Sequence, residues 1–494
     1  GGVYGVDPVI ELSDPKLKRT TFTGNLNTAF IFHLTERLNF RVSGGFNRGY
    51  TEYKSFYPST TASGRIVNGS AYAAINNSLN WLNENTVNYS NTFKGIHDLD
   101  ATLGFSVQKS TAENYSFGAR NFAIQSLGVD NLGLGTNINT PSSDKVQSQL
   151  MSYFGIVRYS LLSRYLFSAI MRADGSSKFP NNRWGYFPFA SFGWKINEEP
   201  FFRNFSRSVS QLKLRLSYGQ TGNESVPPYS SLLRYSSITN TNDNAGGPVP
   251  ALAPISFGVG DLTWETNIQT NVGIDLGLFN DRVLITADAY QKQSKDLLLA
   301  AKIAWASGYK TVYKNVGDIE VKGLEFSVNT QNISSKLFTW NTNFNIAFTK
   351  GKVNRLTDDA EYFYAGGNAD LFIVKVGDRL GGMYGYLQDG IYNSHEELYN
   401  GPTNPVLTVT AGARRYKDIS GPDGKPDGIV NAAYDRTVLG NGNPKFMGGF
   451  NNEFRLGPVD LSMLFTFVYG NSIMNKYEYY YMMANSWQGG PEAM

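Results

Sequence analysis

Hydrophobic and polar residues alternate strictly along residues 267–278. One face carries Ile268, Thr270, Val272, Ile274, Leu276 and Leu278, and the other carries Asn267, Gln269, Asn271, Gly273, Asp275 and Gly277. A period of two fits a β-strand, because a helix needs apolar residues three and four positions apart to form one stripe. After a short polar turn at residues 279–282, a second alternating run extends from Val283 to Lys295. The pattern predicts a long antiparallel hairpin with one apolar and one polar face.

The same alternation recurs along the chain and predicts about fourteen strands. Besides the hairpin, the expected strands cover residues 22–34, 38–47, 99–107, 115–122, 149–159, 165–174, 187–196, 211–219, 324–328, 338–348, 446–455 and 459–469. Residues 110–113 are interpreted as a turn between two of them.

The connections between these runs alternate in length. They are short after residues 34, 109, 160, 278, 331 and 455, and long and polar near 48–96, 123–147, 220–264, 296–320 and 350–445. This rhythm is typical of a transmembrane antiparallel β-barrel with short periplasmic turns and long extracellular loops. A soluble sandwich or propeller, the alternative all-β class, would have connections of similar length at both ends. Residues 350–445 are expected to form an extracellular excursion with a hairpin of its own.

Composition agrees with a membrane barrel and excludes several other classes. Charged residues are only 17%, whereas aromatic residues reach 14%, and soluble domains carry about 25% charged residues. A net charge of +3 gives no reason to expect nucleic acid, and the absence of cysteine excludes disulfides and thiolate sites. Because the chain starts at Gly1 without a visible signal peptide, we expect both ends of a longer protein to be missing.

Several segments together resemble SusC/RagA-type TonB-linked outer-membrane transporters. They are RADGSSKF (172–179), NRWGYFP (182–188), LSYGQTGN (216–223), LTWETN (262–267), NVGDIEVKGLE (315–325), DRTVLG (435–440), NPKF (443–446) and GFNN (449–452).

The resemblance implies a Gram-negative outer-membrane barrel of 22 strands, a plug domain upstream of residue 1 and final strands downstream of residue 494. It also implies import of oligosaccharides, or of peptides, with energy from the TonB–ExbB–ExbD complex. The implied partners are a SusD-like surface lipoprotein, outer-membrane lipid and, in one arrangement, a second transporter–lipoprotein pair. A passive porin or a surface adhesin is the alternative function.

Two groups of residues are candidate binding sites. Asp418, Asp423 and Asp427 lie on a Gly-rich turn, DISGPDGKPDG, and could supply hard oxygen ligands to a structural Ca²⁺. Hydrogen bonds from the Asp side chains to the backbone of a solvated turn are the alternative interpretation. Trp81, Trp305 and Tyr309 lie in expected external loops and could stack on a substrate, although exposed aromatic residues also crowd such loops without binding anything.

Catalysis has little support in the sequence. The chain contains no Gly-x-Ser-x-Gly, His-Glu-x-x-His or phosphate-binding loop motif, and His395-Glu396-Glu397 lacks the second histidine of a zinc site. We therefore expect a protein that is not an enzyme, that requires no cofactor and that performs no chemistry on its cargo.

Overall fold

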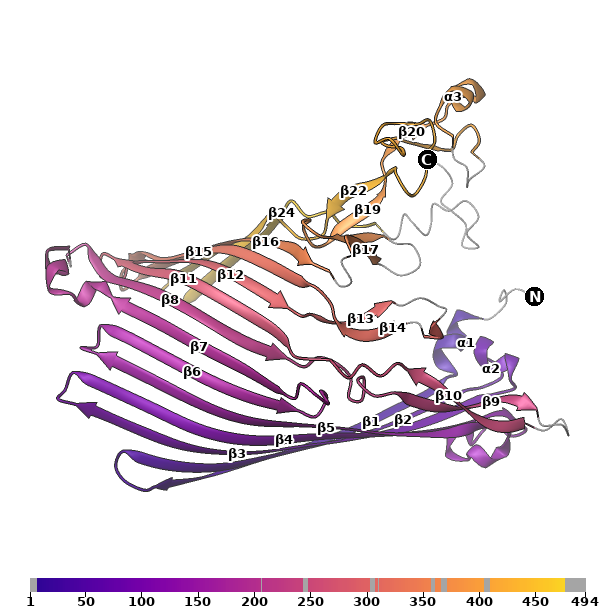
Figure 1. Ribbon diagram of the computed structural model, residues 1–494, viewed down its shortest axis with the longest axis horizontal. Helices are drawn as coiled ribbons and strands as arrows, with labels where there is room; N and C mark the ends of the chain where they lie inside the picture. The colour runs from indigo at the N-terminus through magenta and orange to yellow at the C-terminus, as the bar shows by residue number, and fades with distance from the viewer. Residues whose placement is uncertain are drawn as a thin grey trace. The chain divides into compact units, whose positions relative to one another are not determined.

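The computed structural model describes residues 7–205, 207–242, 248–302, 307–309, 311–356, 360–365, 371–403 and 409–475. Within them, fourteen strands form the main sheet in the order β1-β2-β3-β4-β5-β6-β7-β8-β11-β12-β15-β16-β23-β24 (Figure 1). Their bounds are β1 Lys16–His33, β2 Leu38–Tyr57, β3 Ser70–Phe93, β4 His97–Phe122, β5 Gly135–Leu161, β6 Tyr165–Ser176, β7 Trp184–Lys195, β8 Val209–Asn223, β11 Glu265–Leu278, β12 Val283–Lys295, β15 Asp318–Ser334, β16 Phe338–Arg355, β23 Phe446–Leu456 and β24 Val459–Tyr469. The predicted all-β class is confirmed.

Shorter elements occupy the connections. The helices are α1 Pro8–Ser13, α2 Ala62–Ile66, η1 Gly128–Asp130, η2 Leu132–Leu134, η3 Ile196–Glu198, η4 Pro200–Phe205 and α3 His395–Asn400. Two-stranded sheets pair β9 Arg234–Asn242 with β10 Pro248–Ser256, and β13 Leu298–Lys302 with β14 Thr311–Asn315. No helix in the described ranges combines the length and apolar composition needed to cross a membrane.

The strands and connections correct the sequence prediction around β3 and within β4. Residues 48–96 were expected to be a long loop, but β2 continues to Tyr57 and β3 fills most of the remainder. Residues 110–113 were expected to turn, but they lie inside the single strand β4, where Glu113 pairs with Asn77. One strand was missed and another was divided in two, so the expected number agrees with the fourteen of the main sheet for the wrong reason.

The chain divides into two compact units. The first comprises Gly1–Ala190, Gln220–Glu265 and Leu298–Asn315, and the second comprises Ser191–Gly219, Thr266–Leu297 and Val316–Met494. In the first unit, β1 to β6 pair antiparallel with their neighbours in sequence. Its short connections are residues 34–37, 94–96 and 162–164, and its longer ones include 58–69 and 123–134, so short and long connections alternate.

In the second unit, β11, β12, β15, β16, β23 and β24 form antiparallel pairs in that order. Residues that face each other across β11–β12–β15–β16 share a side of the sheet, so their side chains form rows on that side. Val272, Ala289, Leu324 and Phe348 form one row of the apolar face. The opposite face carries Asn271, Asp275 and Asp288, and the alternation seen in residues 267–278 therefore corresponds to two distinct surfaces.

Residues between β16 and β23 form small sheets separate from the main one. β17 Tyr362–Ala365, β18 Phe372–Lys375, β19 Gly382–Tyr386 and β22 Arg436–Asn441 make a four-stranded sheet, and β20 Gln388–Ile391 pairs with β21 Arg414–Tyr416. We call residues 356–445 the excursion. Its extracellular position stays a prediction.

Candidate functional site

The polar face of the second unit carries an ion triad. The guanidinium of Arg215 on β8 donates from Nε and Nη2 to Asp275 on β11, at 2.9 and 3.0 Å. It also donates from Nη1 and Nη2 to Asp288 on β12, at 3.0 and 2.9 Å. The three side chains are between 19% and 31% exposed. The triad links three strands by a charged group that faces away from the apolar side.

A second site lies in the first unit, where five of the segments that resemble known transporters meet. Trp264 donates its indole N–H to the carbonyl of Arg183 at 2.9 Å. Buried Glu265 accepts from the side chain of Asn223 and from the backbone N–H of Leu298, both at 3.2 Å. Asn315 accepts from the N–H of Thr263 at 3.0 Å and donates to its carbonyl at 2.9 Å. Each bond joins segments that are far apart in the sequence.

Aromatic packing completes this site, which we call the motif cluster. Trp264 lies between Phe179 and Phe187, with ring centroids 5.3 and 5.4 Å away. A β-carbon at Gly222 would collide with the ring of Phe187, so a glycine at this position permits the aromatic packing. The buried members of the cluster are Phe179, Phe187, Val226, Leu262, Trp264 and Leu298. Because they are buried, the motif cluster holds loop ends in place and offers no open surface to a ligand.

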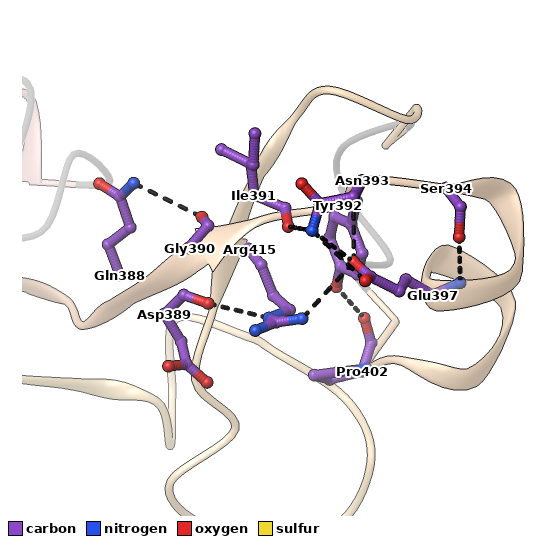
Figure 2. A network of polar contacts seen from close by, with 10 residues as sticks. All are labelled: Gln388, Asp389, Gly390, Ile391, Tyr392, Asn393, Ser394, Glu397, Pro402 and Arg415. Atoms are coloured by element: carbon purple, nitrogen blue, oxygen red, sulfur yellow. Dashed lines mark hydrogen bonds and ion pairs between the residues drawn. The ribbon is translucent and has the colours of Figure 1, made fainter.

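An open polar cavity of about 730 Å³ lies in the excursion. Its lining combines carboxylates (Asp389, Glu396, Glu397, Asp418) with cations (Arg415, Lys417), and also includes Ser394, Asn400 and Tyr416. Figure 2 shows the network beside it, where Arg415 donates to the carbonyl of Asp389 at 2.9 Å and approaches Glu397 at 3.8 Å. Hydroxyl-rich or amide-rich ligands could exchange hydrogen bonds with such a lining.

Glu397 is the electrostatic centre of that network. Its carboxylate accepts from the backbone N–H of Asn393 at 2.9 Å and from the Asn393 side-chain amide at 3.1 Å (Figure 2). These hydrogen bonds, followed by the charge of Arg415, hold the pKa of Glu397 below its ordinary value. The backbone N–H of Glu397 in turn donates to the side-chain oxygen of Ser394, the N-cap residue of α3. The carboxylate is therefore charged and fixed at neutral pH.

The structure places the candidate aromatic residues differently from the prediction. Trp81 is not in a loop: it lies within β3, opposite Phe46 of β2, on the same side as Leu26. Its loop position was wrong because β3 was missed. Tyr309 packs edge-to-face against Phe257, with ring centroids 5.9 Å apart. Trp305 lies outside the described residues. The substrate-binding roles of all three stay predictions.

The acidic turn is held by backbone hydrogen bonds. Asp418 accepts from the N–H of Gly428 at 2.5 Å, and Asp427 accepts from that of Ile429 at 2.9 Å. Nowhere in the described ranges do three or more His, Cys, Asp or Glu side chains gather as metal ligands. Asp418, Asp423 and Asp427 are thus not brought together, and calcium binding stays a prediction.

Asp435 orders this loop, and it was not among the candidate residues predicted from the sequence. It is fully buried and accepts hydrogen bonds from the N–H groups of Ile419, Ser420 and Asn431, at 2.8, 3.2 and 2.8 Å. One carboxylate therefore ties the acidic turn to the start of β22. The available signal was its place as first residue of DRTVLG.

Comparison with known proteins finds TonB-dependent receptors. A family model described as "TonB dependent receptor-like, beta-barrel" matches residues 2–436. TonB-dependent receptor P3 of Formosa agariphila is 32% identical over 470 residues, which are 93% of this chain and 45% of the relative. TonB-dependent receptor SusC of Bacteroides thetaiotaomicron is 28% identical over 499 residues, with 90% and 47% covered. The chain spans about half the length of the curated relatives it matches.

A solved structure shares the fold. The RagAB peptide transporter superposes with a TM-score of 0.80 at 20% identity, and the match covers 94% of this chain and 50% of that one. The same complex in a closed state, described as a peptide importer, gives a TM-score of 0.81.

Proposed function

The chain belongs to the family of TonB-dependent receptor-like β-barrels of the outer membrane, and on that premise we propose that it forms the wall and outer loops of an energy-coupled nutrient importer. The family is one of receptors and transporters. The proposed cargo is an oligomer, and we favour an oligosaccharide over a peptide. Family membership is the observation that carries the proposal.

The two faces of the wall support a transport role. The apolar face exposes Val272, Leu324 and Phe348, as a lipid-facing surface requires. The polar face carries Arg215, Asp275 and Asp288, which would line a hydrated interior. No residue of the wall needs to perform chemistry, because the energy would act on the plug domain expected upstream.

The polar cavity of the excursion is the proposed first contact for cargo. Carboxylates and Arg415 beside Tyr416 offer the mixture of hydrogen-bonding groups and ring surface that suits sugar hydroxyls. Peptides present amides and charged termini to the same groups, and the RagAB complex, which shares the fold, is described as a peptide transporter. A SusD-like lipoprotein would close over the outer loops and deliver cargo to this cavity.

Uptake of labelled oligomers by cells that make the full-length protein tests this function. We expect uptake of oligosaccharide that stops when a protonophore removes the energy supply or when the lipoprotein gene is deleted. Uptake that survives the protonophore would indicate a passive porin, and surface binding without uptake would indicate an adhesin. Uptake of peptides alone would reassign the cargo and leave the transport mechanism standing.

A matched pair of variants locates the cargo contact. Arg415→Gln removes a cation from the cavity lining, whereas Lys425→Gln makes the same change of charge at an exposed residue outside that lining. We expect cargo binding to weaken only in Arg415→Gln. Equal binding in both variants would remove the excursion cavity from the proposal.

A further inference from the structure

A row of polar and basic side chains borders the apolar face of the second unit. Moving two residues along each strand from the row Val272–Ala289–Leu324–Phe348 leads to Thr270, Gln291, Lys322 and Lys350. The four strands lie side by side (Figure 1). The row lies toward the long connections 296–317 and 356–445. It therefore marks the outer edge of the apolar face, where lipid headgroups lie in a membrane.

Like charges face each other in this row. Lys322 on β15 is the direct cross-strand partner of Lys350 on β16, an arrangement that destabilises a sheet unless an anion lies between the two ammonium groups. Lys322 pairs with Glu320 at 3.2 Å. Lys350 has no carboxylate at ion-pair distance among the described residues, and it is exposed.

Two further cations reach the same place from the excursion. A cavity of about 640 Å³ is lined by Lys322, Lys350, Arg379 and Lys445, and its lining contains no carboxylate. Arg379 donates from Nη2 to the carbonyls of Thr349 and Pro444, at 3.2 and 2.7 Å, and these bonds hold its guanidinium in place. Its buried Nε has no hydrogen-bond partner within the described part of the chain. With Glu320 set against Lys322, three positive charges stay uncompensated in this cavity.

An apolar groove continues from the basic cavity along the lipid-facing side. Its volume is about 370 Å³, and it shares Val272, Ala289, Leu324 and Phe348 with the basic cavity. Ala287 and Ala289 form its floor on β12, because their small side chains lie between larger ones on β11 and β15. Ile274 and Phe326 flank Ala287 across the two ladders. The groove has the chemical character of an acyl-chain site.

We propose that this cavity and groove together bind one anionic lipid of the outer leaflet. Its phosphate group would lie among Lys350, Arg379 and Lys445, and an acyl chain would lie over Ala287 and Ala289. Charge complementarity favours a headgroup with a net negative charge over a zwitterionic one, since each basic residue near a headgroup contributes about 1 kcal/mol to binding an anionic lipid. Continuity of the two cavities favours a lipid over a free anion. The bound lipid would fasten the excursion, through Arg379 and Lys445, to the edge of the wall.

Native mass spectrometry of the full-length protein in detergent tests the proposal. The probes are phosphatidylglycerol and phosphatidylcholine with identical acyl chains. We expect selective retention of phosphatidylglycerol. Lys350→Gln combined with Lys445→Gln should weaken it about thirty-fold, from about five-fold for each lysine. The control combines Lys292→Gln with Lys336→Gln, which changes the charge equally outside the lining of the cavity and should retain the lipid.

Three outcomes would overturn the assignment. They are equal retention of the two lipids, equal loss in both double variants, and protection from thermal unfolding by inorganic phosphate as large as that by phosphatidylglycerol. The last would identify a site for free phosphate. A separate variant, Ala289→Phe, fills the groove without touching a charge. It should abolish any preference for long-chain over short-chain phosphatidylglycerol, and an unchanged preference would contradict the acyl-chain site.

Discussion

The indole N–H of Trp264 donates to the backbone carbonyl of Arg183 across 2.9 Å, although 81 residues separate the two in sequence. This bond and the packing of Phe179 and Phe187 around the same ring hold the motif cluster together. Trp264→Phe removes the bond and keeps an aromatic ring, so we expect a loss of about 1 kcal/mol in unfolding free energy. Trp264→Ala also leaves a cavity, and should cost about 3–5 kcal/mol.

Urea unfolding of the full-length protein in lipid vesicles measures both losses. Trp184→Phe is the control, because Trp184 is exposed and has no part in the cluster. Equal losses for Trp264→Phe and Trp264→Ala would mean that the hydrogen bond, and not the packing, dominates.

Arg215→Met leaves Asp275 and Asp288 facing each other without the cation that bridges them. We expect a loss of roughly 1–3 kcal/mol in unfolding free energy, because hydrogen bonds to charged groups are lost at a partly exposed site. Adding Asp275→Asn and Asp288→Asn removes the repulsion and should restore part of the loss. The same urea unfolding measures it, and a triple variant no more stable than Arg215→Met would argue against repulsion as the cause.

Trp81→Ala separates the predicted substrate contact from the role that its position in β3 indicates. On the side that it shares with Leu26 and Phe46, the ring covers apolar surface of the wall. We expect unfolding free energy to fall by about 2 kcal/mol, with cargo affinity unchanged. Isothermal titration with cargo and urea unfolding give the two values. A loss of affinity at unchanged stability would restore the substrate-binding role.

Acidification should loosen the network around Glu397. Because folding lowers the pKa of this carboxylate, its contribution to stability is complete above the ordinary value of 4.5 and is lost as the pH falls through the lowered value. Hydrogen exchange of residues 388–402, corrected for the intrinsic pH dependence of exchange, should therefore accelerate only below about pH 4.5. Glu397→Gln should show the fast rate already at pH 7, and Glu396→Gln should behave as the wild type.

Asp423→Asn tests calcium binding without disturbing the backbone contacts of Asp418 and Asp427. The sequence prediction expects millimolar Ca²⁺ to slow proteolysis of the acidic turn in the wild type and not in Asp423→Asn. Mg²⁺ at the same concentration serves as control. Identical proteolysis with Ca²⁺ and with a chelator would show that hydrogen bonds alone order this turn.

Periodicity predicts the wall only where one face is apolar. Residues 267–278 were predicted correctly because Val272 and Asn271 face different surroundings. β3 was missed because Asn77, Asn83 and Asn85 interrupt the face that carries Leu79, Trp81 and Val87, so its period of two is weak in the sequence. It is a strand because β2 and β4 supply backbone partners along its whole length, which no local pattern reports.

The candidate sites also combine features that the local sequence shows with features that depend on contacts between distant segments. Trp264 and Asn315 could be singled out because they belong to the segments 262–267 and 315–325, whose residues and order resemble those of known transporters. Their meeting at one place depends on the pairing of distant segments, which the sequence does not display. Asp435 was overlooked because a single carboxylate gives no periodic or clustered signal, although it accepts three backbone hydrogen bonds.

The motif cluster also bears on how such receptors diversify. One of its hydrogen bonds joins the two ends of the connection between β8 and β11, because Asn223 is the last residue of β8 and Glu265 is the first of β11. The intervening segment is thereby anchored at its base, and its tip can change in length and sequence without unfolding the wall. The tip of this connection is consequently the position at which segments can be exchanged between relatives with the least disturbance of the wall.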